Sequence, residues 1–565
     1  MAKVISIGNQ SFESIREKDN FYIDKTNFIR EWWDNDDTVT LITRPRRFGK
    51  TLNMSMLECF FSNKYKDRGD LFEGLEIWND EKYRKLQGTY PVIFLSFAEI
   101  KQNNYNDAVE KIKRIVCEVC QQFEFLKNWD GLTEIEKKNI SNISYNMSDV
   151  MAQDLIKNMS NYLSRYYGKK VIILLDEYDT PMQEAYVNGY WEELVAFTRS
   201  LFNSTFKTNP YLERAIMTGI TRVSKESIFS DLNNLKVITV TSDEYSKCFG
   251  FTEDEVFAAL DEQGLSSEKE KVKLWYDGFT FGDEKDVYNP WSIINFLDEK
   301  KYKTYWADSS SNGLVNELIR TGSAEIKKTM ETLIAGGTVE KNIDEQIVFE
   351  QLKTNKDAVW SLLLASGYLR VETFRTEGRL NKKIYSLKLT NYEVEQMFGA
   401  MIERWFGGAD VPYNEFINAM LNGDIESMNE YMNRVTRGVI SYFDTGKTPS
   451  DEEPERFYHG LVLGLMVDQV DNYILNSNRE SGYGRYDIML EPIDKTNEKY
   501  PGIVIEFKVI NPRKESSREE TVAVALKQIE EKNYDAELIK RGVKEENIHH
   551  YGFAFKGKEV LIDGR

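Results

Sequence analysis

The sequence predicts a multidomain α/β protein, and three observations support this prediction. The chain has 565 residues, which is more than a single hydrophobic core usually accommodates. In the N-terminal half, apolar β-branched runs alternate with segments of helical periodicity, as in a parallel sheet covered by helices. Near the C-terminus, two apolar runs flank a polar segment, which indicates a hairpin in a separate domain.

The bulk composition indicates packed domains and limits the classes of function. Apolar residues make up 41% and aromatic residues 13% of the chain, so disorder is not expected. No apolar run approaches the ~18 residues that span a bilayer, and the N-terminus lacks a signal-peptide core. We therefore expect a soluble cytoplasmic protein without a membrane partner. The net charge of −19 argues against broad coating of duplex DNA, although it leaves room for a local basic groove or a nucleotide pocket.

A phosphate-binding loop is predicted where a strand turns into a helix. The strand is expected over residues 38–43, and the loop and helix start read RPRRFGKT (residues 44–51). Free N–H groups and the helix dipole at such a junction attract anions. The spacing fits the template G-x-x-x-x-G-K-T, except that Arg44 replaces the opening Gly. Pro45 is one way to fix that turn, and an ordinary basic turn is the alternative.

Each residue of this loop has an expected role toward a nucleotide. Gly49 lets backbone N–H groups approach the phosphates, Lys50 reaches the β- and γ-phosphates, and Thr51 binds Mg²⁺. Arg46 and Arg47 either add charge near the phosphates or face a partner. The expected nucleotide-binding residues of the loop are Arg46, Arg47, Phe48, Gly49, Lys50 and Thr51.

Two further strands end in polar residues of the kind that a nucleoside triphosphatase needs. The run VIILLDE ends in Asp176 and Glu177, at the sheet edge where α/β proteins bind ligands. Asp176 is expected to hold Mg²⁺, and Glu177 to orient the attacking water. The run RAIMTGITR supplies Thr218 as a γ-phosphate sensor and Arg222 as a charge stabiliser, although turn chemistry explains Thr-Gly equally well. The N-terminal half thus predicts a parallel-sheet P-loop NTPase that binds ATP.

A second acidic cluster is predicted in the C-terminal hairpin. Alternation along the strand over 503–509 places Glu506 and Lys508 on one face, and Asp487 on the neighbouring strand reaches the same face. Two carboxylates and a lysine suit a site for Mg²⁺ or Mn²⁺ that activates water beside a phosphate. A surface hairpin with a salt bridge is the alternative.

Flanking helices supply further candidates for this second site. A helix over residues 523–542 places Gln528 and Lys532 on one face by i,i+4 spacing, where they are expected to contact a phosphate backbone. Upstream, Glu455 and His459 lie four residues apart on another helix. Either of them could complete the metal site, and an ordinary hydrogen-bonded histidine is the alternative for His459.

The remaining segments complete a prediction of five domains. Residues 1–250 form the ATPase domain and 251–324 a helical lid, in which Asn289 caps and Pro290 opens a helix. Residues 325–400 form a winged-helix-like domain, 401–450 a helical connector, and 451–565 the last α/β domain. The hairpin tip of the winged helix is basic, and winged helices either bind DNA or pack against other domains. Because the chain is acidic, packing against other domains or communication between them is favoured over DNA binding. The basic residues at that tip are Arg375, Arg379, Lys382 and Lys383.

The chain resembles bacterial proteins that join an AAA-ATPase-like region to a C-terminal PD-(D/E)XK nuclease domain. The matching segments occur in order over nearly the whole chain: FYIDKTNFI, RPRRFGKTLNMSML, VIILLDEYDTP, MTGITRVS, WYDGF, VYNPWSIINFL, SGYLRVE, NRESGYGRYDIML, IVIEFKV and YGFAFKGKEV. The usual loop of the family also opens with Arg. The resemblance implies ATP binding through Gly49, Lys50, Thr51, Asp176 and Glu177, and nuclease positions at Asp487, Glu506, Lys508 and Gln528.

The function expected from these features is an ATP-binding and ATP-hydrolysing protein that controls a Mg²⁺-dependent nuclease acting on DNA, in defence or mobile-element processing. One alternative is an ATP-driven switch whose nuclease-like domain is inactive and only binds nucleic acid or protein. A stand-alone nuclease with a non-hydrolysing ATPase fold is another. The sequence leaves open whether the protein forms a homo-oligomer.

Overall fold

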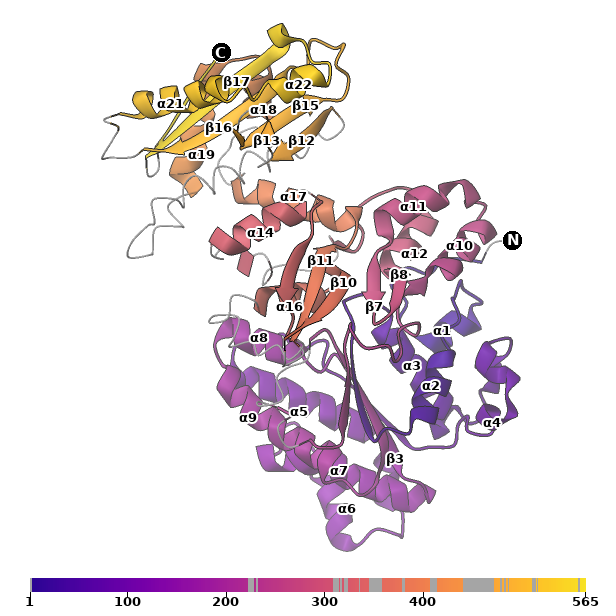
Figure 1. Cartoon of the computed structure of the whole chain (residues 1–565). Helices are drawn as coiled ribbons and strands as arrows, with labels where there is room; N and C mark the ends of the chain where they lie inside the picture. The colour runs from indigo at the N-terminus through magenta and orange to yellow at the C-terminus, as the bar shows by residue number, and fades with distance from the viewer. Residues whose placement is uncertain are drawn as a thin grey trace. The chain divides into compact units, whose positions relative to one another are not determined.

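The computed structural model describes residues 3–221, 228–229, 232–307, 315, 318–319, 324–334, 336–344, 358–378, 382–406, 414–439, 472–477, 480–481, 484–485, 487–510, 515, 517–556 and 559–565. The chain divides into two compact units (Figure 1). The first comprises Met1–Ser311 and Glu340–Val394, and the second comprises Asn312–Val339 and Glu395–Arg565.

The described part of the first unit is built on a five-stranded parallel sheet with the order β2-β3-β4-β1-β5. Its strands are β1 (Val39–Thr43), β2 (Val92–Ser96), β3 (Val171–Asp176), β4 (Leu212–Gly219) and β5 (Leu235–Ile238). Strands β1 and β3 are buried along their whole length, as their uninterrupted β-branched and apolar sequences require. The parallel-sheet α/β fold predicted for the N-terminal half is confirmed.

Helices cover both faces of this sheet (Figure 1). Their bounds are α1 (Phe12–Glu17), α2 (Asn27–Asn35), α3 (Lys50–Phe61), α4 (Glu81–Arg84), α5 (Tyr105–Gln121), α6 (Glu134–Ser141), α7 (Asp149–Tyr167), α8 (Thr180–Asn188) and α9 (Trp191–Phe202). Alternate strand residues such as Ile172 and Leu174 pack with Trp32 of α2 and Leu57 of α3 in one core cluster. Because successive side chains of a strand point to opposite faces of the sheet, the residues adjacent to Ile172 and Leu174 lie on the other face.

After β5 the chain forms a smaller α/β layer within the first unit. It contains β6 (Phe251–Thr252), α10 (Glu253–Glu262), α11 (Lys269–Tyr276), β7 (Phe279–Phe281), β8 (Glu284–Tyr288) and α12 (Pro290–Glu299), with strand order β6-β8-β7. The Asn289 side chain accepts hydrogen bonds from the N–H groups of Trp291 and Ser292. The predicted cap by Asn289 and helix start at Pro290 are therefore confirmed.

A third sheet with the order β10-β11-β9 follows. The elements of this part of the chain are α14 (Ala324–Ile334), β9 (Val339–Asn342), α16 (Ala358–Ala365), β10 (Leu369–Glu377), β11 (Lys382–Leu389) and α17 (Tyr392–Phe406). On the hairpin, the Arg375 guanidinium is paired with Glu340 and Glu377, which reduces the positive charge expected at the tip. Arg379 lies outside the described residues, and the winged-helix assignment stays a prediction.

The second unit contains a mixed sheet with the order β12-β15-β16-β17-β18. Its elements are α18 (Asn414–Leu421), α19 (Ile425–Val439), β12 (Tyr473–Ser477), β13 (Glu480–Ser481), β14 (Gly484–Arg485), β15 (Ile488–Pro492), β16 (Gly502–Val509), α21 (Arg518–Glu531), α22 (Ala536–Lys540), β17 (Ile548–Lys556) and β18 (Glu559–Gly564). Strands β15 and β16 pair antiparallel, so the predicted hairpin is confirmed. Strands β16 and β17 pair parallel, with α21 and α22 between them in the chain.

Helices pack on both faces of this second sheet. Phe416 of α18 and Met428 of α19 share a core cluster with Ile505 and Phe507 of β16. On the other face, Ile529 and Leu538 of the two later helices cluster with β-strand residues. Two helices of the segment predicted as a connector (401–450) thus contribute to the core of the C-terminal sheet. The boundaries between the five predicted domains stay predictions.

The single helix predicted over residues 523–542 is wrong. Helix α21 ends at Glu531, and α22 begins at Ala536. Between them Asn533 has a φ of 51°, in the left-handed region that Asn tolerates better than most residues. The N–H of Tyr534 donates to the carbonyl of Ile529, which closes the helix end as in a Schellman motif. Helical periodicity continues past this point in the sequence and does not mark the break.

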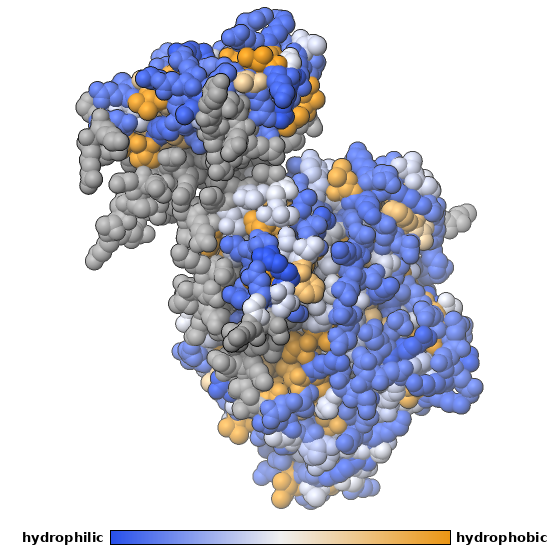
Figure 2. Space-filling view, in the orientation of Figure 1, coloured by the Kyte–Doolittle hydropathy of each residue, from blue (hydrophilic) through white to orange (hydrophobic). Residues whose placement is uncertain are grey.

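The surface of the first unit is consistent with the acidic, polar composition. Figure 2 shows mostly hydrophilic residues on the visible face over α1–α4 and α10–α12. Among the described residues, no helix has the length and apolar character needed to cross a lipid bilayer.

We expect Leu174→Ala to lower the free energy of unfolding of the first unit by about 3 kcal/mol, because Leu174 is fully buried in β3 and its loss leaves a cavity. Urea unfolding followed by circular dichroism measures this change. The matched control is Val150→Ala on the surface of α7, where the side chain is 68% exposed and a change within about 0.5 kcal/mol is expected. Equal effects of the two substitutions would contradict the assignment of β3 to the centre of the core.

Candidate functional sites

The loop between β1 and α3 has the backbone of an anion-binding turn. Gly49 precedes the first residue of α3 and has a φ of 79°, which a glycine adopts without strain. Arg47 also has a positive φ, of 65°. These two turns direct the N-terminus of α3, with its unpaired N–H groups, toward the concave side of the loop.

The Arg44 side chain, at the position where the template has Gly, points into the protein interior. Its guanidinium is fully buried and donates to the carbonyls of Thr43 (2.9 Å) and Thr239 (2.7 Å). It also lies over the rings of Phe249 and Phe281, at 5.7 and 4.5 Å from their centroids. Burial lowers the pKa of Arg44 to about 10. Arg44 therefore ties the loop to the segment after β5.

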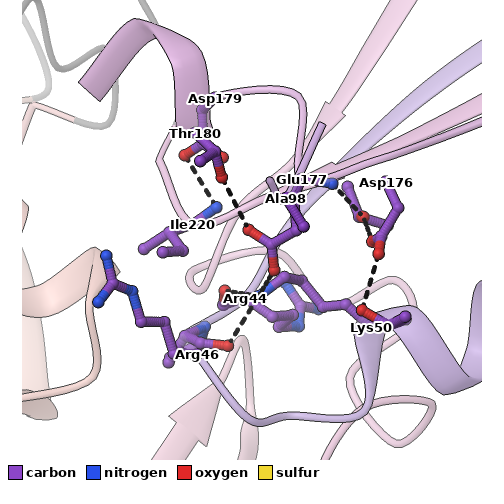
Figure 3. Close-up of polar contacts among 12 residues, drawn as sticks. Arg44, Arg46, Lys50, Ala98, Asp176, Glu177, Asp179, Thr180 and Ile220 are labelled. Carbon is purple, nitrogen blue, oxygen red and sulfur yellow. Dashed lines mark hydrogen bonds and ion pairs between the residues drawn. The ribbon is translucent and has the colours of Figure 1, made fainter. Parts of the chain in front are cut away.

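Lys50 lies on the concave side of the loop. Its ammonium donates to the carbonyls of Arg44 (3.2 Å) and Pro45 (3.1 Å), and it lies 3.4 Å from a carboxylate oxygen of Glu177. Figure 3 shows Lys50, Asp176 and Glu177 converging from α3 and from the end of β3. The Lys50 side chain is only 3% exposed. Water therefore screens its charge weakly, and its interactions with neighbouring charged groups are strengthened.

Three predicted residues form one hydrogen-bonded chain beside Lys50. The Thr51 hydroxyl donates to one oxygen of Asp176 at 2.7 Å, and the Thr218 hydroxyl donates to the other. The contact arises because β4 lies between β1 and β3 in the sheet. Burial and the nearby Glu177 raise the pKa of Asp176, whereas the two threonine hydroxyls lower it. Two oxygen ligands suited to Mg²⁺, on Thr51 and Asp176, thus lie side by side.

Glu177 adopts a backbone conformation that is uncommon for a residue with a side chain, with a φ of 53°. Its N–H donates to the Thr218 hydroxyl at 3.4 Å. This conformation turns the carboxylate toward Lys50, and strained backbone of this kind is frequent at active sites.

The other predicted loop residues are oriented differently. Arg46 and Arg47 are exposed; the Arg46 guanidinium points away from Asp176 (Figure 3), and the Arg47 guanidinium lies 3.9 Å from the ring centroid of Trp291. Phe48 is buried against Phe279, with 4.8 Å between ring centroids. Arg222 lies outside the described residues.

A cavity of about 670 Å³ opens over this loop. Residues 46–53, Asp176 and Glu177 line its polar end. Ile5, Phe21 and Ile23 of the N-terminal segment also line it. Both the volume and the combination of a charged end with apolar walls suit a nucleotide-sized ligand.

Residues far along the chain cover the outer side of the loop. The Arg46 carbonyl accepts hydrogen bonds from the Trp306 indole (3.0 Å) and from the Asn289 amide (3.3 Å). Gly367, with a φ of 86°, packs so closely on Pro45 that an added Cβ would lie 2.9 Å from the Pro45 ring. The loop is thus held in place by residues from later parts of the first unit.

The predicted acidic cluster of the second unit is formed by pairing of β15 with β16. The register pairs Ile488 with Ile505, so Asp487 falls opposite Glu506 on the same face. Asp487 accepts a hydrogen bond from the N–H of Phe507 at 2.8 Å. Glu506 is 2% exposed and accepts hydrogen bonds from Lys508 (3.0 Å) and from the Gln528 amide. The structure thus brings four of the predicted residues together.

Tyr534 also joins this cluster; the sequence places it on the helix predicted over residues 523–542 but gives it no role at the site. Its hydroxyl accepts a hydrogen bond from the Gln528 amide at 3.2 Å. Burial raises the pKa of Tyr534, and the carboxylates of Glu506 and Asp487 raise it further. The turn at Asn533 produces this contact by folding Tyr534 back under α21, and helical periodicity gives no indication of it.

The donor set fits a hard divalent cation, because Asp487 and Glu506 offer carboxylate oxygens on one face. Among the described residues, no group of three or more His, Cys, Asp or Glu side chains forms a ready cage. Glu455 and His459, the two candidates for a further ligand, lie outside the described residues.

Comparison with known families now identifies both regions. A model described as "Predicted AAA-ATPase" matches residues 6–229, and one described as "PD-(D/E)XK nuclease superfamily" matches residues 453–564. The chain joins an AAA-ATPase-like domain to a PD-(D/E)XK nuclease superfamily domain. A similar protein from Azotobacter chroococcum mcd 1, named "Uncharacterized protein in vnfD 5'region", is 25% identical over 396 residues, covering 70% of this chain and 68% of the relative.

We expect Arg44→Gly in the AAA-ATPase-like domain, which restores the general template, to lower the free energy of unfolding by about 3 kcal/mol. The substitution leaves the buried carbonyl of Thr239 without its donor and adds backbone entropy to the unfolded chain. Denaturant unfolding measures the loss. The matched control is Arg46→Gly, two residues away and exposed, which should change stability by less than about 1 kcal/mol. An Arg44→Gly protein as stable as the wild type would show that the buried guanidinium does not hold the loop.

Proposed function

We propose that the AAA-ATPase-like domain binds and hydrolyses ATP and that its nucleotide state controls a Mg²⁺-dependent nuclease, in the second unit, that acts on DNA. The observation that supports this most directly is the hydrogen-bonded chain of Thr51, Asp176 and Thr218 beside the Lys50–Glu177 ion pair. Lysine, two magnesium-type ligands and a water-orienting carboxylate are the groups that phosphoryl transfer to water requires.

The Lys50–Glu177 pair gives ATP binding a direct effect on the catalytic carboxylate. The Lys50 ammonium is bound to two loop carbonyls and lies near Glu177. Phosphate oxygens of ATP compete for the same ammonium, because charge-assisted bonds to phosphate are stronger than bonds to neutral carbonyls. Once Lys50 turns to the phosphates, Glu177 is released to orient a water for attack on the γ-phosphate.

In the nuclease site, Asp487 and Glu506 would hold the divalent ion, Mg²⁺ or Mn²⁺. A bound divalent ion supplies water activation and charge neutralisation at both sites. Lys508 neutralises negative charge that develops on the scissile phosphate. Gln528 holds the Glu506 carboxylate in place through its amide. Either Glu455 or His459 would complete the ligand set.

A DNA substrate and a role in defence or mobile-element processing follow from the resemblance to this class of protein, and both are part of the proposal. The net charge of −19 makes broad DNA coating unfavourable. Contact with DNA is therefore expected to be local, and ATP-dependent control would restrict cleavage to defined conditions.

Metal-dependent cleavage of linear and circular DNA tests the nuclease site. Asp487→Asn and Lys508→Ala should each lower cleavage by at least about 100-fold, because one removes a metal ligand and the other a charge at the reacting phosphate. Asp494→Asn and Lys527→Ala are matched controls, since both residues lie on the exposed surface of the same unit. Cleavage that persists in both site variants would remove this cluster as the active site. Binding of DNA without cleavage under any divalent metal would favour an inactive nuclease-like domain under ATP control.

ATP turnover tests the first site. Lys50→Ala should abolish detectable ATP binding, whereas Glu177→Gln should retain binding and lower turnover by about 100-fold, the range of a lost water-orienting base. Lys64→Ala, on the exposed surface just after α3, is the control. Nuclease assays of the same proteins with and without ATP test the coupling. Cleavage that is independent of ATP in the wild type would disprove control by nucleotide and leave a stand-alone nuclease.

A further inference from the structure

The turn after β3 is joined to the end of β4 by a network of hydrogen bonds. The Tyr178 N–H donates to the Thr218 carbonyl at 2.9 Å, and the Tyr178 hydroxyl donates to the Thr221 carbonyl at 2.8 Å. One oxygen of Asp179 accepts from the N–H groups of Ile220 (3.0 Å) and Thr221 (2.8 Å) and from the Thr221 hydroxyl (3.0 Å). The Gln183 amide of α8 donates to the same oxygen at 3.0 Å. Figure 3 shows Asp179 beside Ile220.

Asp179 is fully buried, and a buried carboxylate destabilises a fold unless hydrogen bonds compensate for lost hydration. Burial and the charge of Glu177 raise the pKa of Asp179, whereas the hydrogen bonds from Thr221 and Ile220 lower it. The hydrogen bonds from the backbone of the β4 end thus oppose the effect of burial on this carboxyl group. The same backbone is in turn fixed by the carboxylate.

Gly219 makes this arrangement sterically feasible. A Cβ at Gly219 would lie 2.6 Å from the second oxygen of Asp179 and 2.7 Å from the ring of Tyr178. The glycine after Thr218 is therefore required by the approach of Asp179 and Tyr178, and not only by turn chemistry. Thr218, Gly219 and Thr221 all belong to one contact surface with the turn after β3.

We propose that Asp179 is a positioning residue for ATP hydrolysis, which fixes the backbone after Thr218 so that the Thr218 hydroxyl stays bonded to Asp176. This inference rests on the proposed ATPase function and adds a residue to it. Asp179 acts through the β4 end, because its bonded oxygen accepts from Ile220 and Thr221. Ile220 lines the cavity together with Glu177 and Thr180. A small displacement of Thr218 would disturb the Asp176 carboxylate that is expected to hold Mg²⁺.

ATP turnover and affinity for a non-hydrolysable ATP analogue, measured on the full chain, test this role. Asp179→Ala should lower kcat by at least about tenfold with the analogue Kd within about twofold, because misplacement of a catalytic group affects the reaction more than ground-state binding. Asp179→Asn keeps an acceptor oxygen for Ile220 and Thr221 and should retain most of the activity. An Asn variant as impaired as the Ala variant would overturn the proposal, since it would indicate a need for the charge itself.

A double-mutant cycle with Thr218→Ala separates positioning from a general loss of structure. If Asp179 acts through Thr218, Asp179→Ala should have little further effect on kcat once Thr218 is alanine. Additive losses would overturn the proposal. Thr221→Val and Tyr178→Phe each remove one hydroxyl of the same network and should lower kcat with unchanged analogue affinity, so they provide the test if Asp179→Ala does not fold. The matched control is Thr198→Val, a buried threonine of α9.

The outcomes distinguish this inference from the proposed function. Absence of ATP turnover in the wild type, or turnover unaffected by Lys50→Ala, would overturn both. Wild-type turnover that depends on Lys50 but is unchanged in Asp179→Ala, Thr221→Val and Tyr178→Phe would overturn the positioning role alone.

Discussion

The loop between β1 and α3 depends on one buried cation. A phosphate loop that opens with Gly relies on a flexible residue to make its first turn, whereas here Arg44 makes the turn and extends its side chain inward. The guanidinium then satisfies the carbonyls of Thr43 and Thr239 and lies over two aromatic rings. Five donors in a rigid plane suit this task better than the single ammonium of lysine. The curvature of the loop is thus specified by an interior contact, and the side that faces the cavity remains free for a ligand.

Much of the first site could be predicted from local sequence. The strand before the loop, the helix after it and the Asp176–Glu177 pair at a strand end all follow from short periodic patterns that the structure confirms. The direction of the Arg44 side chain could not be predicted from such patterns, because its partner Thr239 lies 195 residues away in the sequence. The same applies to Asp179, because two of its partners, Ile220 and Thr221, follow the end of β4, about 40 residues later in the sequence. Local sequence patterns thus identify the candidate site residues. The residues that position them are determined by contacts between distant parts of the sequence.

The second site illustrates the same division. Alternation along β16 places Glu506 and Lys508 on one face, and hairpin pairing brings Asp487 opposite. The contribution of Tyr534 depends on a left-handed Asn533 that ends a helix early, and nothing in the apolar periodicity marks that residue. Helix α21 ends where it does because Tyr534 packs under it. Apolar periodicity in the sequence does not predict a contact of this kind.

The covering of the loop has a consequence for the order in which the protein folds during synthesis. The loop residues leave the ribosome early, yet the groups that satisfy the Arg46 carbonyl and pack on Pro45 belong to Asn289, Trp306 and Gly367. Contacts of such high sequence separation form late and slow the acquisition of the native state. A nascent chain that ends at residue 229, where the AAA-ATPase match ends, therefore lacks the outer support of its own phosphate loop. The loop over residues 44–51 therefore acquires its full set of supporting contacts only after most of the first unit has been translated.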